Sequence, residues 1–123
     1  MALDVLIVDD SAAIRKILER VLRHADFHLG EVIEAGDGRE ALEKLQGRTV
    51  GLILSDINMP NMDGLEFLQN VKANEAWRNL PMIMVTTEGS QDKVLQAIQL
   101  GAAGYIRKPF TAEQIKEKLI GIL

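Results

Sequence analysis

Residues 52–64 read LILSDINMPNMDG. The first three side chains are apolar and typical of a buried strand, whereas the later ones are rich in Asn, Met, Pro and Gly and typical of a loop. Asp56 lies at the junction between the two. A carboxylate at the end of a buried strand loses hydration, and this loss is costly unless the charge is paired. The segment therefore predicts that charged partners or a cation lie beside Asp56.

The composition is that of one soluble domain. The chain has 123 residues, of which 47% are hydrophobic and 26% are charged, and these are ordinary proportions for a single globular core. The net charge of −4 predicts no general attraction to nucleic acid or to an anionic membrane surface. Cysteine is absent, which excludes disulfides, thiolate metal sites and a cysteine nucleophile. No apolar run is long enough for a signal peptide or a membrane span. We expect a monomeric, cytoplasmic domain over residues 1–123.

Apolar runs and helical patterns alternate along the chain. The apolar runs, which predict strands, are residues 5–8, 31–35, 51–55, 82–86 and 104–106. The helical stripes comprise Ile14, Ile17, Leu18, Val21 and Leu22; Ala41, Leu42 and Leu45; Leu65, Leu68 and Val71; Val94, Leu95 and Ile98; and Ile115, Leu119 and Ile120. Gly30, Gly47 and Gly101 predict helix ends, and Thr111 with Gln114 predicts a capping box. Five strands that alternate with helices predict an α/β fold whose parallel sheet is covered on both faces.

Polar side chains end four of the predicted strands. Doubly wound parallel sheets bind ligands at the carboxyl ends of their strands, and a common order for five strands is 2-1-3-4-5, in which strands 1 and 3 are neighbours. That order brings Asp9 and Asp10 next to Asp56. Three carboxylates repel one another unless a cation neutralises them, and Mg²⁺ suits oxygen ligands. Thr86 and Lys108 would add a hydroxyl and an ammonium, which together with a metal suit a phosphoryl group.

Each of these residues also has a simpler interpretation. Asp9 and Asp10 could favour the start of the first helix, and Asp56 could begin a turn. Thr86 could be an ordinary strand residue, and Lys108 could be a solvated charge. All five stand at the same end of the same predicted sheet. This coincidence favours a phosphoryl-binding site over five unrelated local roles.

Four motifs carry a resemblance to a known family over the whole chain. They are VDDS at residues 8–11, SDINMPNMDG at 55–64, MVTTEG at 84–89 and GAAGYIRKPF at 101–110. With these motifs the chain resembles the receiver domains of two-component response regulators, most closely the single-domain chemotaxis regulators of the CheY type. The resemblance implies a flavodoxin-like fold, in which a five-stranded parallel sheet of order 2-1-3-4-5 is doubly wound with five helices. It also implies a cis peptide bond between Lys108 and Pro109.

The resemblance implies a phosphorylation site in the predicted acidic pocket. Asp56 would be the phosphoacceptor, and a partner histidine kinase would be the phosphodonor. Asp9, Asp10 and Asp56 would hold Mg²⁺ together with the backbone carbonyl of Asn58. Lys108 would contact the phosphoryl group. A carboxylate can attack phosphorus, and the cations are needed because two anions must approach each other.

Further residues are implied to control the signal and its lifetime. Thr86 would also contact the phosphoryl group and would form a switch pair with Tyr105. Asn58 and Glu88 would flank the path of the water that hydrolyses the acyl phosphate, and Thr87 stands where the chemotaxis type commonly has alanine. The surface formed by the fourth helix, the fifth strand and the fifth helix, residues 90–123, would bind a downstream target such as a flagellar motor switch component. A dedicated phosphatase is a further implied partner.

Other functions remain open at this point. The chain could be a phosphorelay intermediate or a receiver excised from a larger regulator. A metal-dependent phosphohydrolase with an aspartyl-phosphate intermediate uses similar residues, although many such enzymes carry a D-x-D motif on their first strand and this chain has adjacent aspartates there. A flavin- or nucleotide-binding protein is disfavoured because no glycine-rich loop follows the first strand. We expect no turnover of an exogenous substrate.

Overall fold

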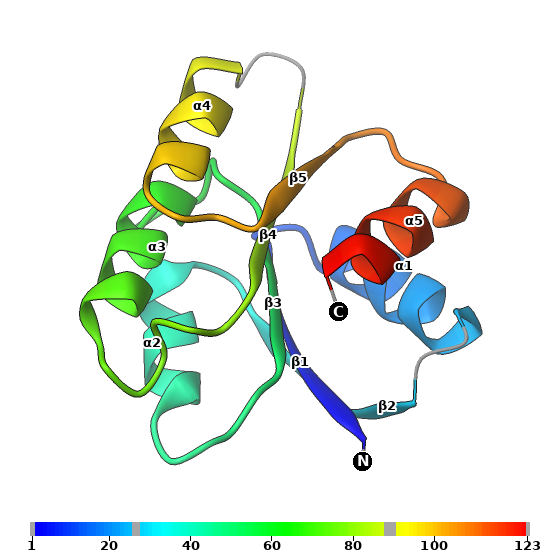
Figure 1. Cartoon of the computed structure of the whole chain (residues 1–123), viewed down its shortest axis with the longest axis horizontal. Helices are drawn as coiled ribbons and strands as arrows, with labels where there is room; N and C mark the ends of the chain where they lie inside the picture. Colours follow the sequence, from blue (N-terminus) through cyan, green and yellow to red (C-terminus); the bar gives the residue numbers. More distant parts are fainter. Residues whose placement is uncertain (1, 26–27, 88–90, 123) are drawn as a thin grey trace.

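The computed structural model describes residues 2–25, 28–87 and 91–122. Its elements in chain order are β1 (Leu3–Val8), α1 (Ala12–His24), β2 (Leu29–Ala35), α2 (Gly38–Leu45), β3 (Leu52–Ser55), α3 (Gly64–Ala73), β4 (Met82–Thr86), α4 (Gln91–Gln99), β5 (Gly104–Arg107) and α5 (Ala112–Ile122). The strands form one sheet in the order β2-β1-β3-β4-β5, and all its pairs are parallel (Figure 1). The predicted fold class and strand order are confirmed.

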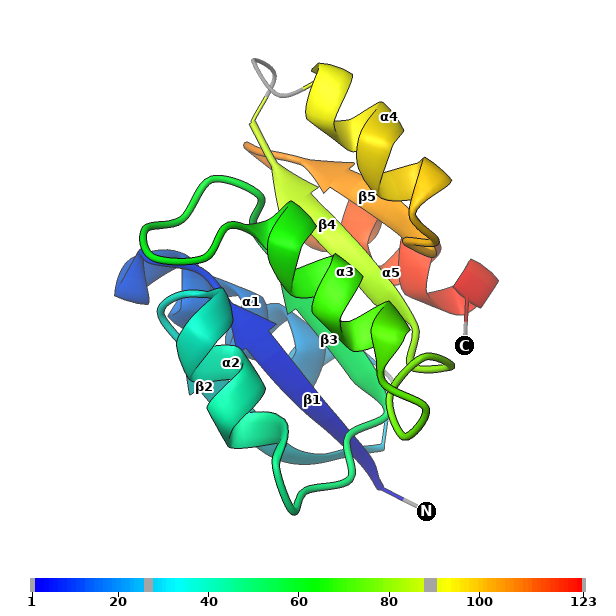
Figure 2. The same ribbon diagram turned by 90° about the vertical axis from the view of Figure 1, so that its left-hand side faces the viewer.

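Helices cover both faces of the sheet. The helices α2, α3 and α4 lie on one face, and α1 and α5 lie on the other (Figures 1 and 2). Side chains alternate along each strand, so Leu6 of β1 packs in the core beneath the first set of helices and Val5 packs in the core beneath the second. The strands β3 and β4 are buried along their whole length, as expected of central strands in a doubly wound sheet.

One predicted helix end is wrong. Gly30 lies inside β2, which begins at Leu29 rather than at residue 31. A Cβ atom at this position would lie 2.3 Å from Oδ1 of Asp4, and the same oxygen accepts a hydrogen bond from the backbone of Glu31 at 2.7 Å. The glycine thus allows the side chain of Asp4 on β1 to approach the backbone of β2. In the sequence, a glycine in this role cannot be told from a glycine that ends a helix. Gly47 and Gly101 do follow helices, with φ of 71° and 107°.

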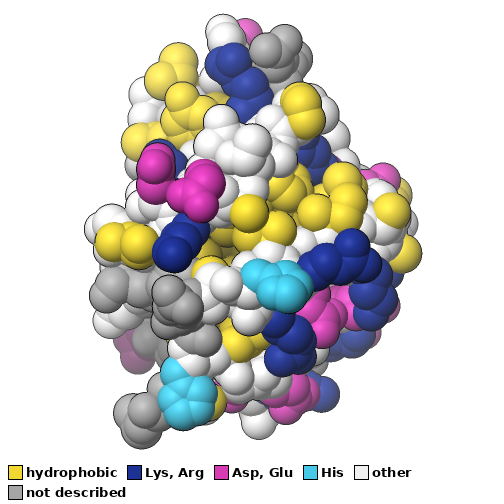
Figure 3. Space-filling model, turned by 90° about the vertical axis from the view of Figure 1, so that its right-hand side faces the viewer, with side chains coloured by type: hydrophobic (Ala, Val, Ile, Leu, Met, Phe, Trp, Pro, Cys, Tyr) yellow, Lys and Arg dark blue, Asp and Glu magenta, His cyan; other side chains and the backbone are white. Residues whose placement is uncertain are grey.

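Three of the predicted helical stripes include exposed apolar side chains. In α4, Val94 is buried, but Leu95 and Ile98 are 64% and 44% exposed. Ile120 in α5 is 62% exposed, and Ile17 in α1 is 42% exposed. These helices each meet the sheet along a narrow strip, so the flanks of their apolar stripes remain at the surface. On the face that α1 and α5 cover, apolar surface lies beside a group of Lys and Arg side chains (Figure 3).

The helix termini follow the predicted local rules. The hydroxyl of Thr111 accepts a hydrogen bond from the backbone of Gln114, whose side chain accepts one in return from the backbone of Thr111, so the predicted capping box is present.

The bond between Lys108 and Pro109 is cis, as predicted. No helix among the described residues is both long and apolar enough to cross a membrane.

Candidate phosphoryl-binding site

The carboxyl ends of β1 and β3 bring three acidic residues together. The pairing of Val8 with Ser55 places the next residues of both strands side by side, and the backbone of Asp56 donates to the carbonyl of Val8 at 2.8 Å. Carboxylate oxygens of Asp9, Asp10 and Asp56 lie within 4.8 Å of one another. The predicted adjacency of strands 1 and 3 therefore produces the predicted cluster.

The loop after β3 folds back tightly on Asp56. The backbone of Gly64 donates to the carbonyl of Ile57 at 2.7 Å, and a Cβ atom on Gly64 would lie 2.2 Å from the carbonyl oxygen of Asp56. Only glycine fits this close approach of backbone to backbone. Asp63 then caps α3 by accepting a hydrogen bond from the backbone of Glu66. The segment 57–63 is thus a closed loop that holds Asp56 at the end of its strand.

Lys108 connects two of the three carboxylates. Its Nζ lies 2.8 Å from Oδ2 of Asp9 and 3.2 Å from Oδ2 of Asp56. The other oxygen of Asp56, Oδ1, accepts a hydrogen bond from the backbone of Ile57 at 2.7 Å. Asp9 and Asp56 are buried, whereas Asp10 is exposed. The site therefore has an inner, paired part and an open side that carries the third carboxylate.

Burial and neighbouring opposite charge have opposing effects on the pKa values of Asp56 and Lys108. Burial is the main reason that the pKa of Asp56 is raised, and the charge of Asp9 adds to this effect, while Lys108 counteracts it. For Lys108, burial alone would lower the pKa, but the hydrogen bond to Asp9 and the charges of Asp56 and Asp9 outweigh it and raise the pKa. Lys108 therefore stays charged at neutral pH. Its charge offsets only part of the effect of burial on Asp56.

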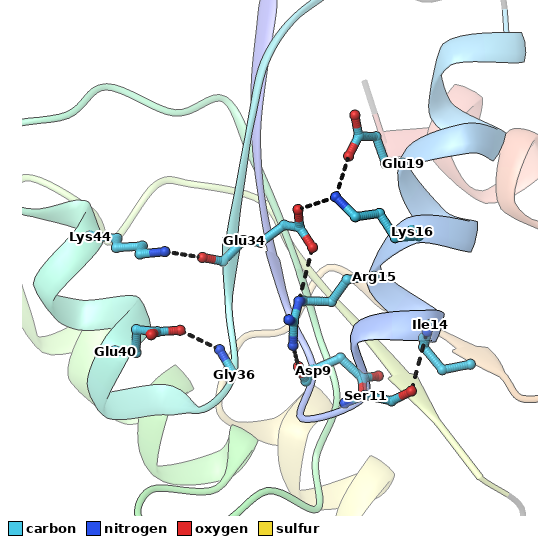
Figure 4. A network of polar contacts seen from close by, with 10 residues as sticks. All are labelled: Asp9, Ser11, Ile14, Arg15, Lys16, Glu19, Glu34, Gly36, Glu40 and Lys44. Carbon is cyan, nitrogen blue, oxygen red and sulfur yellow. Dashed lines mark hydrogen bonds and ion pairs between the residues drawn. The ribbon is translucent and has the colours of Figure 1, made fainter.

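A polar network supports Asp9 from the side of α1. Oδ1 of Asp9 accepts a hydrogen bond from the backbone of Ser11, and the hydroxyl of Ser11 caps α1 by accepting one from Ile14. Arg15 donates to the backbone carbonyl of Asp9 at 2.6 Å and also to Glu34 on β2 at 3.0 Å (Figure 4). Asp9 therefore does contact the start of α1, as its simpler interpretation proposed, but the residue that caps the helix is Ser11.

The residues of the cluster fit a magnesium ion. Mg²⁺ prefers oxygen ligands and keeps several waters, and the cluster offers three carboxylates, one of them on the exposed side. Nitrogen and sulfur ligands, which would favour zinc, are not among the residues of this cluster. The donor chemistry therefore agrees with the predicted metal.

The predicted switch residues lie on the neighbouring strands. Thr86 ends β4 and is 2% exposed, and its hydroxyl is 3.5 Å from the carbonyl of Thr87. Tyr105 on β5 is 41% exposed, and Nζ of Lys118 lies 5.6 Å from the centre of its ring. A cavity of about 280 Å³ lies between them and α4; its lining is Thr86, Thr87, Gln91, Val94, Leu95, Ile98, Tyr105 and Arg107. Space is therefore present beside Thr86 for a rearranged side chain.

The loop residues predicted to control hydrolysis are only partly described. Glu88 lies outside the described residues, and so do Ser90 and Leu123 at the two ends of the predicted output surface. Asn58 is exposed, and its Oδ1 accepts a hydrogen bond from Nζ of Lys93 on α4 at 2.9 Å. The sequence contained no signal for this contact, because the two residues are 35 positions apart and a lysine on a helix usually indicates a solvated face.

Comparison with known proteins identifies the family. A profile described as "Response regulator receiver domain" matches residues 5–120. The chain belongs to the response regulator receiver domain family. This receiver domain is 41% identical over 115 residues to "Chemotaxis protein CheY" of Pseudomonas aeruginosa, covering 94% of the chain and 91% of that protein. It is also 41% identical to "Chemotaxis protein CheY-3" of Vibrio cholerae, again over 94% of the chain, and covers 87% of that protein.

Solved structures agree with this assignment. The structure of chemotaxis response regulator CheY4 of Vibrio cholerae matches the receiver domain with a TM-score of 0.88 and 39% identity over all of both chains. A putative response regulator from Chloroflexus aurantiacus matches with a TM-score of 0.90 and 29% identity, covering 99% of this chain and 98% of that one. The predicted family is therefore confirmed.

Proposed function

We propose that this receiver domain, extending over residues 1–123, is a phosphorylation-controlled binding module in which Asp56 accepts a phosphoryl group. The observation that carries the proposal is the position of its carboxylate. Asp56 is buried at the end of β3, within reach of two other carboxylates and of the ammonium of Lys108. Its Oδ1 is held by the backbone of Ile57, so the carboxylate has a defined orientation toward an incoming group. A carboxylate held in this way is preorganised as a nucleophile.

Asp9, Asp10, Asp56 and the backbone carbonyl of Asn58 would hold Mg²⁺. When bound, the ion would supply positive charge to the phosphoryl oxygens and so reduce the repulsion between two anions. Lys108 would add its fixed positive charge beside the carboxylate of Asp56. Because its pKa is raised, it would stay charged over the physiological range.

The donor would be a phosphohistidine on a partner histidine kinase. In the transfer, an oxygen of Asp56 forms the bond to phosphorus while the bond between phosphorus and the imidazole nitrogen breaks. The electron pair of the broken bond returns to the imidazole. Such a donor places the domain in the cytoplasm. The domain itself would turn over no exogenous substrate, and a dedicated phosphatase could assist the return step.

The signal would leave through the surface formed by α4, β5 and α5. Each charge-assisted hydrogen bond from Thr86 or Lys108 to a phosphoryl oxygen is worth about 1.5–3 kcal/mol, and a shift of a population from 1:99 to 99:1 needs about 5.5 kcal/mol. Both bonds together are therefore needed. Movement of Thr86 toward the phosphoryl group would enlarge the cavity beside it, and Tyr105 lines that same cavity.

This surface has the character of a protein-binding site. Leu95 and Ile98 of α4 and Tyr105 of β5 are exposed large apolar side chains, and all three line the cavity beside Thr86. Exposed apolar groups that gather on neighbouring elements mark interaction surfaces. The similarity to proteins named as chemotaxis proteins supports a downstream target in motility, such as a flagellar motor switch component. A role as a phosphorelay intermediate or as part of a larger regulator is the alternative.

The test of phosphorylation is mass spectrometry of the intact protein after incubation with Mg²⁺ and a small acyl-phosphate donor. We expect one added phosphoryl group that is labile to hydroxylamine, and its loss in Asp56→Asn, because an amide lacks the nucleophilic oxygen. Asp63→Asn is the matched control: it makes the same change in the same loop, and asparagine caps a helix as well as aspartate. Retention of the adduct in Asp56→Asn would show that another residue is the acceptor.

The test of output is a double-mutant cycle between Thr86→Ala and Tyr105→Ala. The measured quantity is the gain in affinity for the motor switch component on phosphorylation. Thr86→Ala should leave formation of the adduct nearly normal but remove most of this gain, because the phosphoryl group then lacks one of its two bonds. If the two changes act as one switch, their effects are not additive. Fully additive effects would contradict the switch pair.

A further inference from the structure

A lysine of the output helix reaches the loop of the phosphoacceptor. Lys93 lies in the first turns of α4, and its Nζ donates to Oδ1 of Asn58 at 2.9 Å. Asn58 follows Asp56 by two residues, within the loop that Gly64 closes. The helices α3 and α4 pack side by side on the same face of the sheet (Figure 2). The contact therefore joins an element of the proposed output surface directly to the proposed site of phosphorylation.

The chemistry of the pair determines the orientation of the asparagine. A lysine ammonium has three donors and no acceptor, so Asn58 must turn its carbonyl oxygen, and not its amide nitrogen, toward Lys93. That oxygen is the acceptor of the side chain that a water molecule near the acyl phosphate could use. While Lys93 holds it, the oxygen is directed toward α4.

We propose that Lys93 is a positioning residue that prolongs the phosphorylated state by holding Oδ1 of Asn58. This inference rests on the proposed function, in which Asp56 carries the phosphoryl group. In hydrolysis, the water oxygen bonds to phosphorus, and the bond between phosphorus and the Asp56 oxygen breaks with its electron pair returning to the carboxylate. The proton of the water leaves to solvent. Asn58 can orient this water by accepting a hydrogen bond from it, and Lys93 competes for the same acceptor.

The position of Lys93 makes this control sensitive to the output surface. Its neighbours Val94 and Leu95 line the cavity beside Thr86 and Tyr105. A shift of α4 moves the ammonium with the helix and releases or tightens its bond to Asn58. A partner that clamps α4 in place keeps Asn58 engaged and so preserves the signal while it is being read.

The first experiment measures the rate of dephosphorylation after the donor is removed, in the presence of Mg²⁺, by intact mass. We expect Lys93→Ala to lose its phosphoryl group roughly threefold faster than the wild type, the scale of one modest hydrogen bond in the transition state. Gln96→Ala changes an exposed residue of the same helix, and Arg20→Gln removes one positive charge from α1, a helix on the opposite face of the sheet. Both controls should leave the rate unchanged. Equal rates in Lys93→Ala and the wild type would overturn the proposal.

A second background separates positioning from simple charge. In Asn58→Ala, which keeps the backbone carbonyl but removes the side-chain acceptor, Lys93→Ala should have no further effect on the rate. If Lys93 acted only through its charge, the acceleration would persist in this background, and the proposal would be wrong.

A third measurement needs no phosphoryl group or metal. The side-chain amide resonances of Asn58 in the metal-free protein should shift in Lys93→Ala and stay in place in Gln96→Ala. Unchanged resonances in both would show that the contact is absent in solution and would overturn the inference while leaving the proposed function intact. A wild-type protein that forms no adduct would instead overturn the proposed function, and the inference with it.

Discussion

Two carboxylates of this domain bind lysine side chains and respond in opposite ways. Asp56 at the end of the central strand β3 has a raised pKa, mainly because of its burial. Glu34 on the edge strand β2 has a lowered pKa, mainly because Lys16 donates a hydrogen bond to it at 2.9 Å, with a further contribution from Arg15. Burial dominates in the first environment, whereas hydrogen bonds from two cations dominate in the second.

The two environments suit different roles, a structural one for Glu34 and a reactive one for Asp56. Glu34 is surrounded by cations and remains in contact with water, so its charge stabilises the fold (Figure 4). Asp56 shares one lysine with a second carboxylate and lies near a third, so its charge is available to a metal and a phosphoryl group. Arg15 connects the two regions, since it binds Glu34 and the backbone of Asp9 at the same time. The ion pairs around Glu34 thus fix the position of Asp9 in the acidic cluster.

The largest expected effect is on metal binding. Asp10→Asn should weaken Mg²⁺ binding by about tenfold or more, because it removes a full charge from a ligand of a hard cation. Glu31→Gln is the matched comparison, since it removes one carboxylate charge from an exposed pair with Arg48 outside the cluster and should leave the affinity nearly unchanged. Calorimetric titration at fixed ionic strength measures both. Unchanged affinity in Asp10→Asn would mean that this residue serves the start of α1 and not a metal.

The next effect is a gain in stability when the acceptor is neutralised. Asp56→Asn should stabilise the metal-free protein by about 1 kcal/mol at neutral pH, the scale of one unfavourable buried group. Because the folded pKa of Asp56 is raised, the folded state binds more protons than the unfolded state. The wild type therefore loses stability relative to the mutant as pH rises from the unfolded value, about 3.9, through the folded pKa.

Urea unfolding across this pH range in a metal chelator measures the difference between the two proteins. The difference in stability should vanish at low pH, where Asp56 is protonated in both the folded and the unfolded protein. It should reach its full size above the folded pKa of Asp56. A mutant that is less stable than the wild type at neutral pH would show that the pairing with Lys108 outweighs the burial of Asp56.

Glu34→Gln should show the opposite sign. The folded pKa of Glu34 is lowered, so its stabilising effect is present above the unfolded value, about 4.3, and is lost as pH falls through the folded pKa. Water screens this half-exposed network, so the cost at neutral pH is about 0.5–1 kcal/mol. The same unfolding experiment should show this cost shrinking at high salt. A cost that does not depend on pH would point to lost packing and not to lost charge.

The smallest effect concerns the lifetime of the phosphorylated state. Thr87 follows Thr86 and is exposed, and beside a phosphoryl group on Asp56 its bulk would hinder an attacking water. Thr87→Ala should therefore shorten the lifetime by about twofold, a few tenths of a kcal/mol in the barrier. The decay of the adduct after removal of the donor measures it. An equal or longer lifetime would remove the steric argument.

Local rules in the sequence predicted most of the fold and the centre of the site. The alternation of apolar runs with helical stripes predicted an α/β sheet, and polar residues predicted which strand ends carry the site. Both kinds of signal are short-ranged, since they depend on spacing within one strand or helix and on the residue that follows it. The expectation that Asp9, Asp10 and Asp56 meet also needed the strand order that is common in this class of sheet. Gly30 shows the limit of such rules, because a helix end and a close approach between strands use the same residue.

Contacts between distant segments required the tertiary structure. The sequence by itself determined the residue types that a phosphoryl-binding site needs and the strand ends that carry them. Only the folded chain decided that Lys108 binds Asp9 and Asp56 together, that Arg15 supports Asp9 from Glu34, and that Lys93 reaches Asn58 from α4. The physical reason is that a flexible cationic side chain has the same local pattern whether it is solvated or bonded. Its partner is set by which strands and helices pack beside it.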